Sequence, residues 1–178
     1  MNDAGSQDAP KTSQAYHSNR QRAKVFAWWF CVVLWAGFIF FMSAHTGEDL
    51  DDGSSFFGWI KQQLTFFAET LFGPGTDIVS VVAHFLEYTI FGALLTAAIA
   101  HTYRYMQTKR CEGTFPHRSI PLGPIIVLAI ALASLYGATD EFHQSFIPER
   151  MADPADWVTD TLGASLGTLL IAWVLPRK

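Results

Sequence analysis

The sequence predicts an all-α membrane protein, a bundle of four transmembrane helices with an additional amphipathic helix in the first extracytoplasmic loop. Half of the 178 residues are hydrophobic and 16% are charged, whereas soluble domains carry about 25% charged residues. Four segments are long and apolar enough to cross a bilayer core, which requires about 20 residues of helix. The basic residues also gather on one side of these four segments.

The chain begins with a polar segment, residues 1–24, that has almost no large aliphatic side chains and ends in three basic residues. This composition is typical of a flexible tail. Residues 25–42, VFAWWFCVVLWAGFIFFM, carry no charge and form the first predicted span. A signal peptide has a similar basic flank, but its apolar region is shorter and an A-x-A cleavage site follows it, so a span is favoured. We expect residues 25–178 to form one membrane domain.

Three further spans are predicted at residues 77–100, 122–146 and 155–175. Each contains ionisable residues, so the flanking charges decide their assignment. If all four segments cross the membrane, ten of the twelve Lys and Arg residues lie on one side. The positive-inside rule then places both termini of this multi-pass membrane protein in the cytoplasm.

The loop after the first span contains SFFGWIKQQLTFFAETLF, residues 55–72. Its apolar residues recur at helical spacing, which predicts an amphipathic helix that lies on the outer leaflet or caps the bundle. A partner-binding helix would show the same pattern. The residues of the apolar face are Phe56, Ile60, Leu64, Phe67 and Leu71.

Composition also excludes several classes of function. A net charge of −4 argues against a nucleic-acid partner, because phosphate binding requires a basic surface. The two cysteines, Cys31 and Cys111, lie in an apolar run and in a polar stretch, so they predict no disulfide framework. No nucleophile motif, phosphate loop or HExxH zinc signature is present. Membrane lipid is the expected partner, and the oligomeric state stays open.

Two predicted spans carry ionisable groups at helical spacing. In the second span, AHFLEYTIFG places His84, Glu87 and Tyr88 on one helical face. In the fourth span, Asp156 and Asp160 are four residues apart. Such groups cost several kcal/mol inside a membrane unless they face a partner or a wet cavity. We therefore expect them to converge.

The third span adds a second set of polar residues. ATDEFHQSF gives Asp140, His143 and Gln144 a shared face, with Glu141 turned about 100° away. With both termini inside, all these polar residues fall in the outer half of the bundle. The sequence thus predicts one polar pocket that opens to the exterior.

The string SLYGATDEFHQSFIPERMADPADWVTDTLGASLG, together with AHFLEYTIFGALL and FMSAHTG, resembles the VanZ-like family of small polytopic bacterial membrane proteins. The resemblance implies a role in the cell envelope, since the family's namesake is linked to resistance to the glycopeptide teicoplanin. It rests on Ser43, His84, Tyr88, Glu141, Gln144, Pro148, Arg150, Asp156, Asp160, Gly163 and Gly167.

Two classes of function follow from these residues. In the first, favoured class the pocket recognises an envelope lipid, a lipid-linked cell-wall precursor or a glycopeptide-related ligand. Its binding residues are Ser43, Tyr88, Gln144, Arg150, Asp156 and Asp160. The alternative is a membrane-embedded hydrolase or transferase that acts on a lipid or lipid-linked precursor. Its catalytic candidates are His84, Glu87, Asp140 and Glu141, with Glu87 or Asp140 as general base.

Some of these residues have structural alternatives. Asp153 followed by Pro154 is typical of a helix N-cap and first helical residue. Asp156 would then lie in the first turn, where its carboxylate interacts favourably with the positive end of the helix dipole. Gly163 and Gly167 form a G-x-x-x-G pair that favours close helix packing. Arg150 could form an anion clamp, a salt bridge to Glu141, or a pair in a solvated loop.

A divalent metal is a weaker alternative, and no cofactor is predicted. Imidazole and carboxylate groups from two helices resemble the ligand sets of di-metal carboxylate bundles. The candidate ligands are His84, Glu87, Asp140 and His143. A metal-free polar network is the favoured interpretation.

Overall fold

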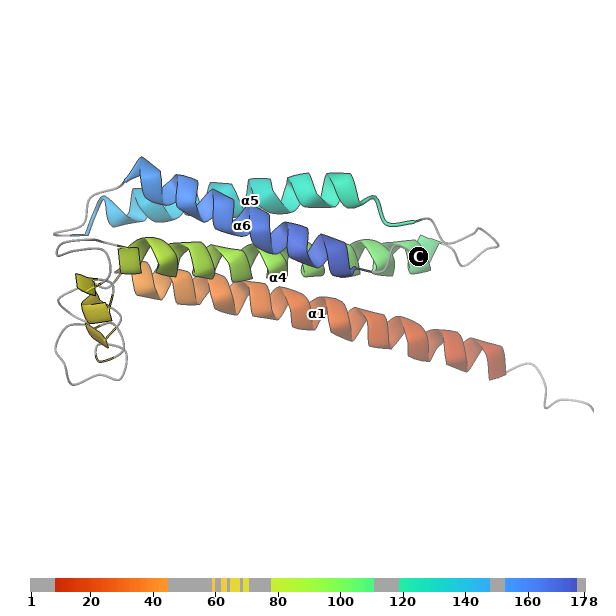
Figure 1. The fold of residues 1–178 in the computed structure, drawn as a ribbon. Coiled ribbons are helices and arrows are strands. Elements are labelled where there is room, and N and C mark those ends of the chain that lie inside the picture. Colours follow the sequence, from red (N-terminus) through yellow and green to blue (C-terminus); the bar gives the residue numbers. More distant parts are fainter. Residues whose placement is uncertain are drawn as a thin grey trace, which may run out of the picture.

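Four long helices make up most of the part of the chain that the structure describes. The computed structural model describes residues 9–44, 59, 62–63, 65–67, 69–70, 78–110, 119–147 and 153–175. The helices are α1 (Ala9–Ala44), α4 (Ile78–Arg110), α5 (Leu122–Gln144) and α6 (Pro154–Val174). They run along a common direction (Figure 1). Each contains a segment long and apolar enough to cross a membrane, which confirms the predicted all-α four-span fold class.

The two ends of the bundle carry opposite charge. Figure 1 shows that α1 and α5 end where α4 and α6 begin. We call this the acidic end, because every Asp and Glu on the four helices lies toward it: Glu87, Asp140, Glu141, Asp156 and Asp160. We call the other the basic end, because it holds every Lys and Arg of the four helices: Lys11, Arg20, Arg22, Lys24, Arg104, Lys109 and Arg110. This separation is the pattern from which cytoplasmic termini were predicted.

Two helices are longer than their predicted spans. α1 begins at Ala9, inside the segment assigned to the polar tail, and α4 continues to Arg110 rather than ending near residue 100. The extensions contain no glycine, and the one proline, Pro10, lies in the first turn, where it is compatible with a helix. Nothing in the local sequence therefore ends either helix at the membrane surface.

The predicted amphipathic helix over residues 55–72 lies largely outside the described residues. Eight positions between 59 and 70 are described and are helical, and the Thr70 hydroxyl donates to the Phe66 carbonyl at 2.7 Å. These positions do not establish the whole helix, which stays a prediction.

Close packing of α4 against α6 depends on three glycines. A Cβ atom added at Gly163 or Gly167 would overlap the backbone carbonyl oxygen of Phe85 or Thr89. In the opposite direction, a Cβ at Gly92 would overlap the carbonyl of Ala164. The packing interpretation of the G-x-x-x-G pair is confirmed, since only glycine leaves room for these backbones.

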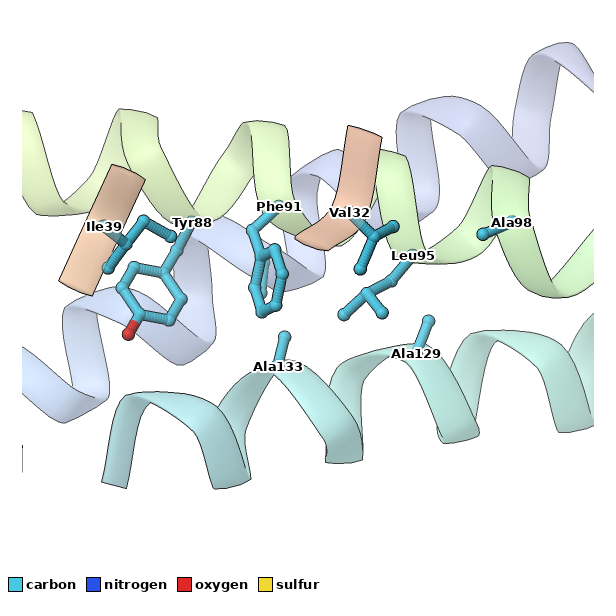
Figure 2. Close-up of a cluster of buried hydrophobic side chains, with 9 residues drawn as sticks. Val32, Ile39, Tyr88, Phe91, Leu95, Ala98, Ala129 and Ala133 are labelled. Atoms are coloured by element: carbon cyan, nitrogen blue, oxygen red, sulfur yellow. The ribbon is translucent and has the colours of Figure 1, made fainter. Parts of the chain in front are cut away.

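An apolar cluster with members from all four helices fills the middle of the bundle (Figure 2). Its α5 members are alanines, which let that helix approach the larger side chains of α4. The labelled members are Val32, Ile39, Tyr88, Phe91, Leu95, Ala98, Ala129 and Ala133. This cluster positions Tyr88, whose ring belongs to the core and whose hydroxyl belongs to the site described below.

Hydrogen bonds from aromatic side chains attach α1 to the other helices. The Tyr136 hydroxyl donates to the Ala36 carbonyl at 2.7 Å, and Trp35 Nε1 donates to the Glu87 carbonyl at 2.9 Å. Because hydrocarbon offers no competing water, such bonds to backbone oxygens hold the helices at a defined depth relative to one another.

The start of α6 follows the predicted cap. The side chain of Asp153 accepts a hydrogen bond from the Ala155 backbone N–H at 2.8 Å, and Pro154 is the first helical residue. The N-cap interpretation of Asp153 and Pro154 is thereby confirmed.

Candidate functional site

Seven polar side chains are buried together toward the acidic end, and each of the four helices contributes at least one. Their exposed fractions range from 0% to 8%. We call this set the buried polar cluster: Ser43 of α1; His84 and Tyr88 of α4; Asp140, Glu141 and Gln144 of α5; and Asp160 of α6. The structure therefore places the principal predicted site residues inside the bundle, away from lipid, as the cost of isolated polar groups in hydrocarbon requires.

His84 and Asp160 form a buried pair between α4 and α6. His84 Nδ1 lies 3.3 Å from Asp160 Oδ1, and Asp160 is fully buried. With its proton on Nδ1, the ring donates to the carboxylate, which fixes the ring orientation. The sequence pattern favoured Glu87 or Asp140 as the acidic group beside His84, whereas the structure pairs His84 with Asp160.

A second group links α1 to α5 through Asp140. The Ser43 hydroxyl donates to Asp140 Oδ2 at 2.6 Å, and Gln144 Nε2 donates to the same oxygen at 3.2 Å. Gln144 Nε2 also lies 3.4 Å from Ser43 Oγ. Asp140 and Gln144 thus share a face as their spacing predicts, and Ser43 completes the group from another helix.

Gly137 lets Asp160 of α6 lie close to α5, the helix that carries Asp140. A Cβ atom at this position would lie 3.2 Å from Asp160 Oδ2, so the absent side chain leaves room for the carboxylate of α6 against α5. Gly137 precedes Asp140 by one helical turn, which makes the two positions neighbours on the same face. The Tyr88 side chain is also fully buried, on the same helix as His84 and one turn from it. The carboxylates, the imidazole and the phenol therefore belong to one site.

Several buried atoms of this site have no hydrogen-bond partner within the described part of the chain. They are Tyr88 Oη, Asp140 Oδ1, Glu141 Oε1, His143 Nε2 and Asp160 Oδ2. Buried polar atoms are paired in the great majority of native structures, because an unpaired one costs about 1–3 kcal/mol. These atoms can form further hydrogen bonds.

Glu141 has a structural contact that the sequence did not indicate. One carboxylate oxygen, Oε2, accepts a hydrogen bond from the Asp153 backbone N–H at 2.9 Å. Glu141 therefore attaches the end of α5 to the start of α6, and its side chain contacts a different element from that of Asp140, which agrees with the expected turn of about 100° between them. Asp156 is half-buried in the first turn of α6, where its carboxylate suits the helix dipole.

The remaining candidates lie around the cluster rather than inside it. Glu87 is half-buried on α4. His143 is half-buried, and its ring stacks on Phe40 with 4.4 Å between centroids. Arg150 lies outside the described residues. Over the described ranges, no group of three or more His, Cys, Asp or Glu side chains is arranged to hold a metal ion.

Comparison with known proteins identifies the family. The VanZ/LLP1 family model matches residues 28–175, a range that includes most of α1 and all of α4, α5 and α6. Searches of curated proteins and of solved structures found no match. Because the match extends over most of the sequence, the chain belongs to the VanZ/LLP1 family, and its four candidate spans point to a multi-pass membrane protein.

Proposed function

We propose that this protein binds an envelope lipid or a lipid-linked cell-wall precursor at the buried polar cluster. The observation that carries the proposal is the set of buried oxygens without hydrogen-bond partners in the described residues: Tyr88 Oη, Asp140 Oδ1 and Asp160 Oδ2. They come from three helices and are all buried toward the acidic end, in a part of the bundle where isolated polar groups are costly. A ligand that supplies hydrogen-bond donors would satisfy these atoms.

The chemistry of the oxygens defines which ligand groups suit the site. Both carboxylate oxygens are acceptors, and the phenol can donate or accept. Hydroxyl, amide and ammonium groups are matching donors, and they occur on lipid headgroups and on lipid-linked sugars and peptides. A headgroup that enters between α1 and α5 would replace the hydrogen bonds from Ser43 and Gln144 to Asp140.

The proposed setting is the bacterial cell membrane, with both termini in the cytoplasm and the acidic end facing outward. The separation of charge along the four helices supports this orientation. It would expose the site to ligands of the outer leaflet, which include the precursors that are used outside the cell.

We further propose that this recognition contributes to glycopeptide resistance, as the family resemblance implies for teicoplanin. Deletion of the gene is expected to reduce growth in teicoplanin, and the wild-type gene is expected to restore it. Restoration by a variant with both Asp140→Asn and Asp160→Asn would contradict the role of the cluster.

An enzymatic function is the second candidate, and the pair of His84 and Asp160 favours it. When Nδ1 donates to Asp160, the lone pair of the neutral ring lies on Nε2, which can act as a general base. A carboxylate that orients an imidazole in this way is a recurrent arrangement in hydrolases. The reaction would be hydrolysis or group transfer on a lipid-linked precursor.

One experiment separates these functions. The purified protein is incubated with extracted envelope lipids, washed and analysed by mass spectrometry. The variant with Asp140→Asn and Asp160→Asn should retain at least tenfold less of the bound lipid, because hydrogen bonds to charged groups contribute about 1.5–3 kcal/mol each. Asp153→Asn is the control, since it makes the same change at the exposed N-cap of α6, where asparagine also caps the helix.

The outcomes are distinct. Selective retention by the wild-type protein and the control supports binding. A new lipid product that the double variant does not form supports the enzyme. Equal retention by all three proteins, with no product, would refute both.

A further inference from the structure

Polar side chains from three helices approach one turn of α5, over residues 136–140. Asp140 lies on this turn. Gly137 leaves room there for Asp160 of α6, because a Cβ at Gly137 would lie 3.2 Å from Asp160 Oδ2. Positions three apart on a helix have Cβ atoms about 5–6 Å apart, so Asp160 Oδ2 lies within about 9 Å of the Asp140 Cβ atom.

Tyr88 of α4 reaches the same turn of α5. Its ring lies 6.5 Å from the ring of Tyr136, measured between centroids. Tyr136 immediately precedes Gly137. Figure 2 shows the Tyr88 hydroxyl directed away from α4 and toward α5. Tyr88 and Asp160 thus approach consecutive residues of α5, one turn from Asp140.

Each of these three side chains has one oxygen without a hydrogen-bond partner in the described residues. The oxygens are Tyr88 Oη, Asp140 Oδ1 and Asp160 Oδ2, and none of the three residues is more than 3% exposed. The other oxygen of each carboxylate already has a partner, which is Ser43 for Asp140 and His84 for Asp160. These contacts orient both carboxylates inside the bundle.

The buried polar cluster holds more acidic than basic groups. Asp140, Glu141 and Asp160 are its carboxyl groups, and the His84 imidazole is its one basic group. Every Lys and Arg on the four helices lies at the basic end. A buried carboxylate without a countercharge is costly in a low-dielectric interior. The cluster therefore favours a cationic ligand over a neutral one.

A primary ammonium group matches both the charge and the unpartnered oxygens. It supplies one positive charge and three N–H donors. A hydroxyl supplies one donor without charge, and a quaternary ammonium supplies charge without an N–H donor. Hydrogen bonds between ionised groups are also about twice as strong as neutral ones.

We propose that the buried polar cluster binds a lipid whose headgroup carries a primary ammonium, with Tyr88 Oη, Asp140 Oδ1 and Asp160 Oδ2 as its acceptors. This inference rests on the lipid binding proposed above and specifies the headgroup. A lipid suits the site better than a soluble amine, because exposed apolar side chains such as Phe40 of α1 and Phe142 of α5 can contact its acyl chains.

The test compares three lipids with identical acyl chains, supplied in equal amounts to the full-length protein in detergent. Phosphatidylethanolamine carries a primary ammonium, phosphatidylcholine a quaternary ammonium and phosphatidylglycerol only hydroxyls. Native mass spectrometry measures the lipid that is retained. We expect the wild-type protein to retain at least about tenfold more phosphatidylethanolamine than either of the other lipids.

Two variants connect this preference to the cluster. Asp160→Asn removes the charge at nearly constant shape and should retain about tenfold less phosphatidylethanolamine. Tyr88→Phe removes one acceptor, keeps the ring of the core and should retain about fivefold less, so it tests the site even if the aspartate variant folds poorly. Asp153→Asn, at the exposed N-cap of α6, is the control and should retain as much as the wild type.

The outcomes separate this inference from the proposed function. Equal retention of phosphatidylglycerol or phosphatidylcholine that still falls in Asp160→Asn would overturn the ammonium assignment and keep lipid binding at the cluster. Displacement of phosphatidylethanolamine by millimolar ethanolamine would assign the site to a soluble amine instead. Wild-type retention of phosphatidylethanolamine by Tyr88→Phe and Asp160→Asn would place its ammonium elsewhere. If neither variant changed the retention of any lipid, including the extracted envelope lipids, the proposed binding function would fail as well.

Discussion

Replacement of Gly167 by alanine is expected to lower the free energy of unfolding by about 3 kcal/mol. A Cβ at this position overlaps the backbone carbonyl oxygen of Thr89, so α4 and α6 must separate to accommodate it. Backbone cannot move aside in the way that the end of a flexible side chain can. The separation would also withdraw Asp160 from His84, because the two helices carry one partner each.

Gly37→Ala is the matched control for this prediction. No atom lies within 4 Å of a Cβ built at Gly37, so the same chemical change meets open space on α1. It should leave stability unchanged or raise it by up to about 1 kcal/mol, the ordinary helix preference for alanine. Unfolding in detergent micelles, followed by circular dichroism, measures both variants. Equal stability of the two would show that close approach of α4 and α6 is not needed.

Asp160→Ala is expected to destabilise the fold by about 3–5 kcal/mol and to abolish retention of the lipid that binds the buried polar cluster. The substitution removes the hydrogen bond to His84 and leaves the imidazole buried beside an empty space. The helix content of the folded fraction and the amount of bound lipid are the measurements.

The double variant His84→Leu, Asp160→Leu separates stability from function. Replacement of a buried ion pair by apolar side chains of similar size is often neutral or stabilising, so this protein should recover most of the lost stability. It should still fail to retain lipid, because the acceptor oxygens of Asp160 are absent. Wild-type retention of lipid by the leucine variant would contradict the proposed binding function, whereas stability as low as that of Asp160→Ala would show that the polar pair is required for folding.

The sequence is informative about the spans and about which residues gather in the site. The spans can be predicted from the hydropathy of each segment alone. The pitch of an α-helix then places residues such as Asp140 and Gln144 on one face. The cost of a lone charge in hydrocarbon then requires polar faces to meet. Gly163 and Gly167 indicate close packing by their spacing alone. These inferences need no knowledge of how the helices are rotated.

Contacts between helices depend on how each helix is rotated about its axis. This rotation cannot be predicted from the sequence alone. The pairing of His84 with Asp160 rather than with Glu87 or Asp140 follows from the register of α6 against α4, which the glycines set. The role of Gly137 cannot be predicted from the sequence either, because its missing side chain leaves room for Asp160 of another helix. The partners of adjacent charges are also not given by the sequence: Glu141 contacts the start of α6, whereas its neighbour Asp140 contacts α1.

The opposite charges of the two ends couple this molecule to the membrane voltage. A potential that is negative inside draws the basic end of α1 and α4 inward and repels the carboxylates of α4, α5 and α6 outward. Each elementary charge moved through the full field gains about 2.3 kcal/mol per 100 mV. Such a voltage would therefore favour, during insertion, the same orientation that the positive-inside rule predicts, and an inverted molecule would carry unfavourably placed charges at both ends.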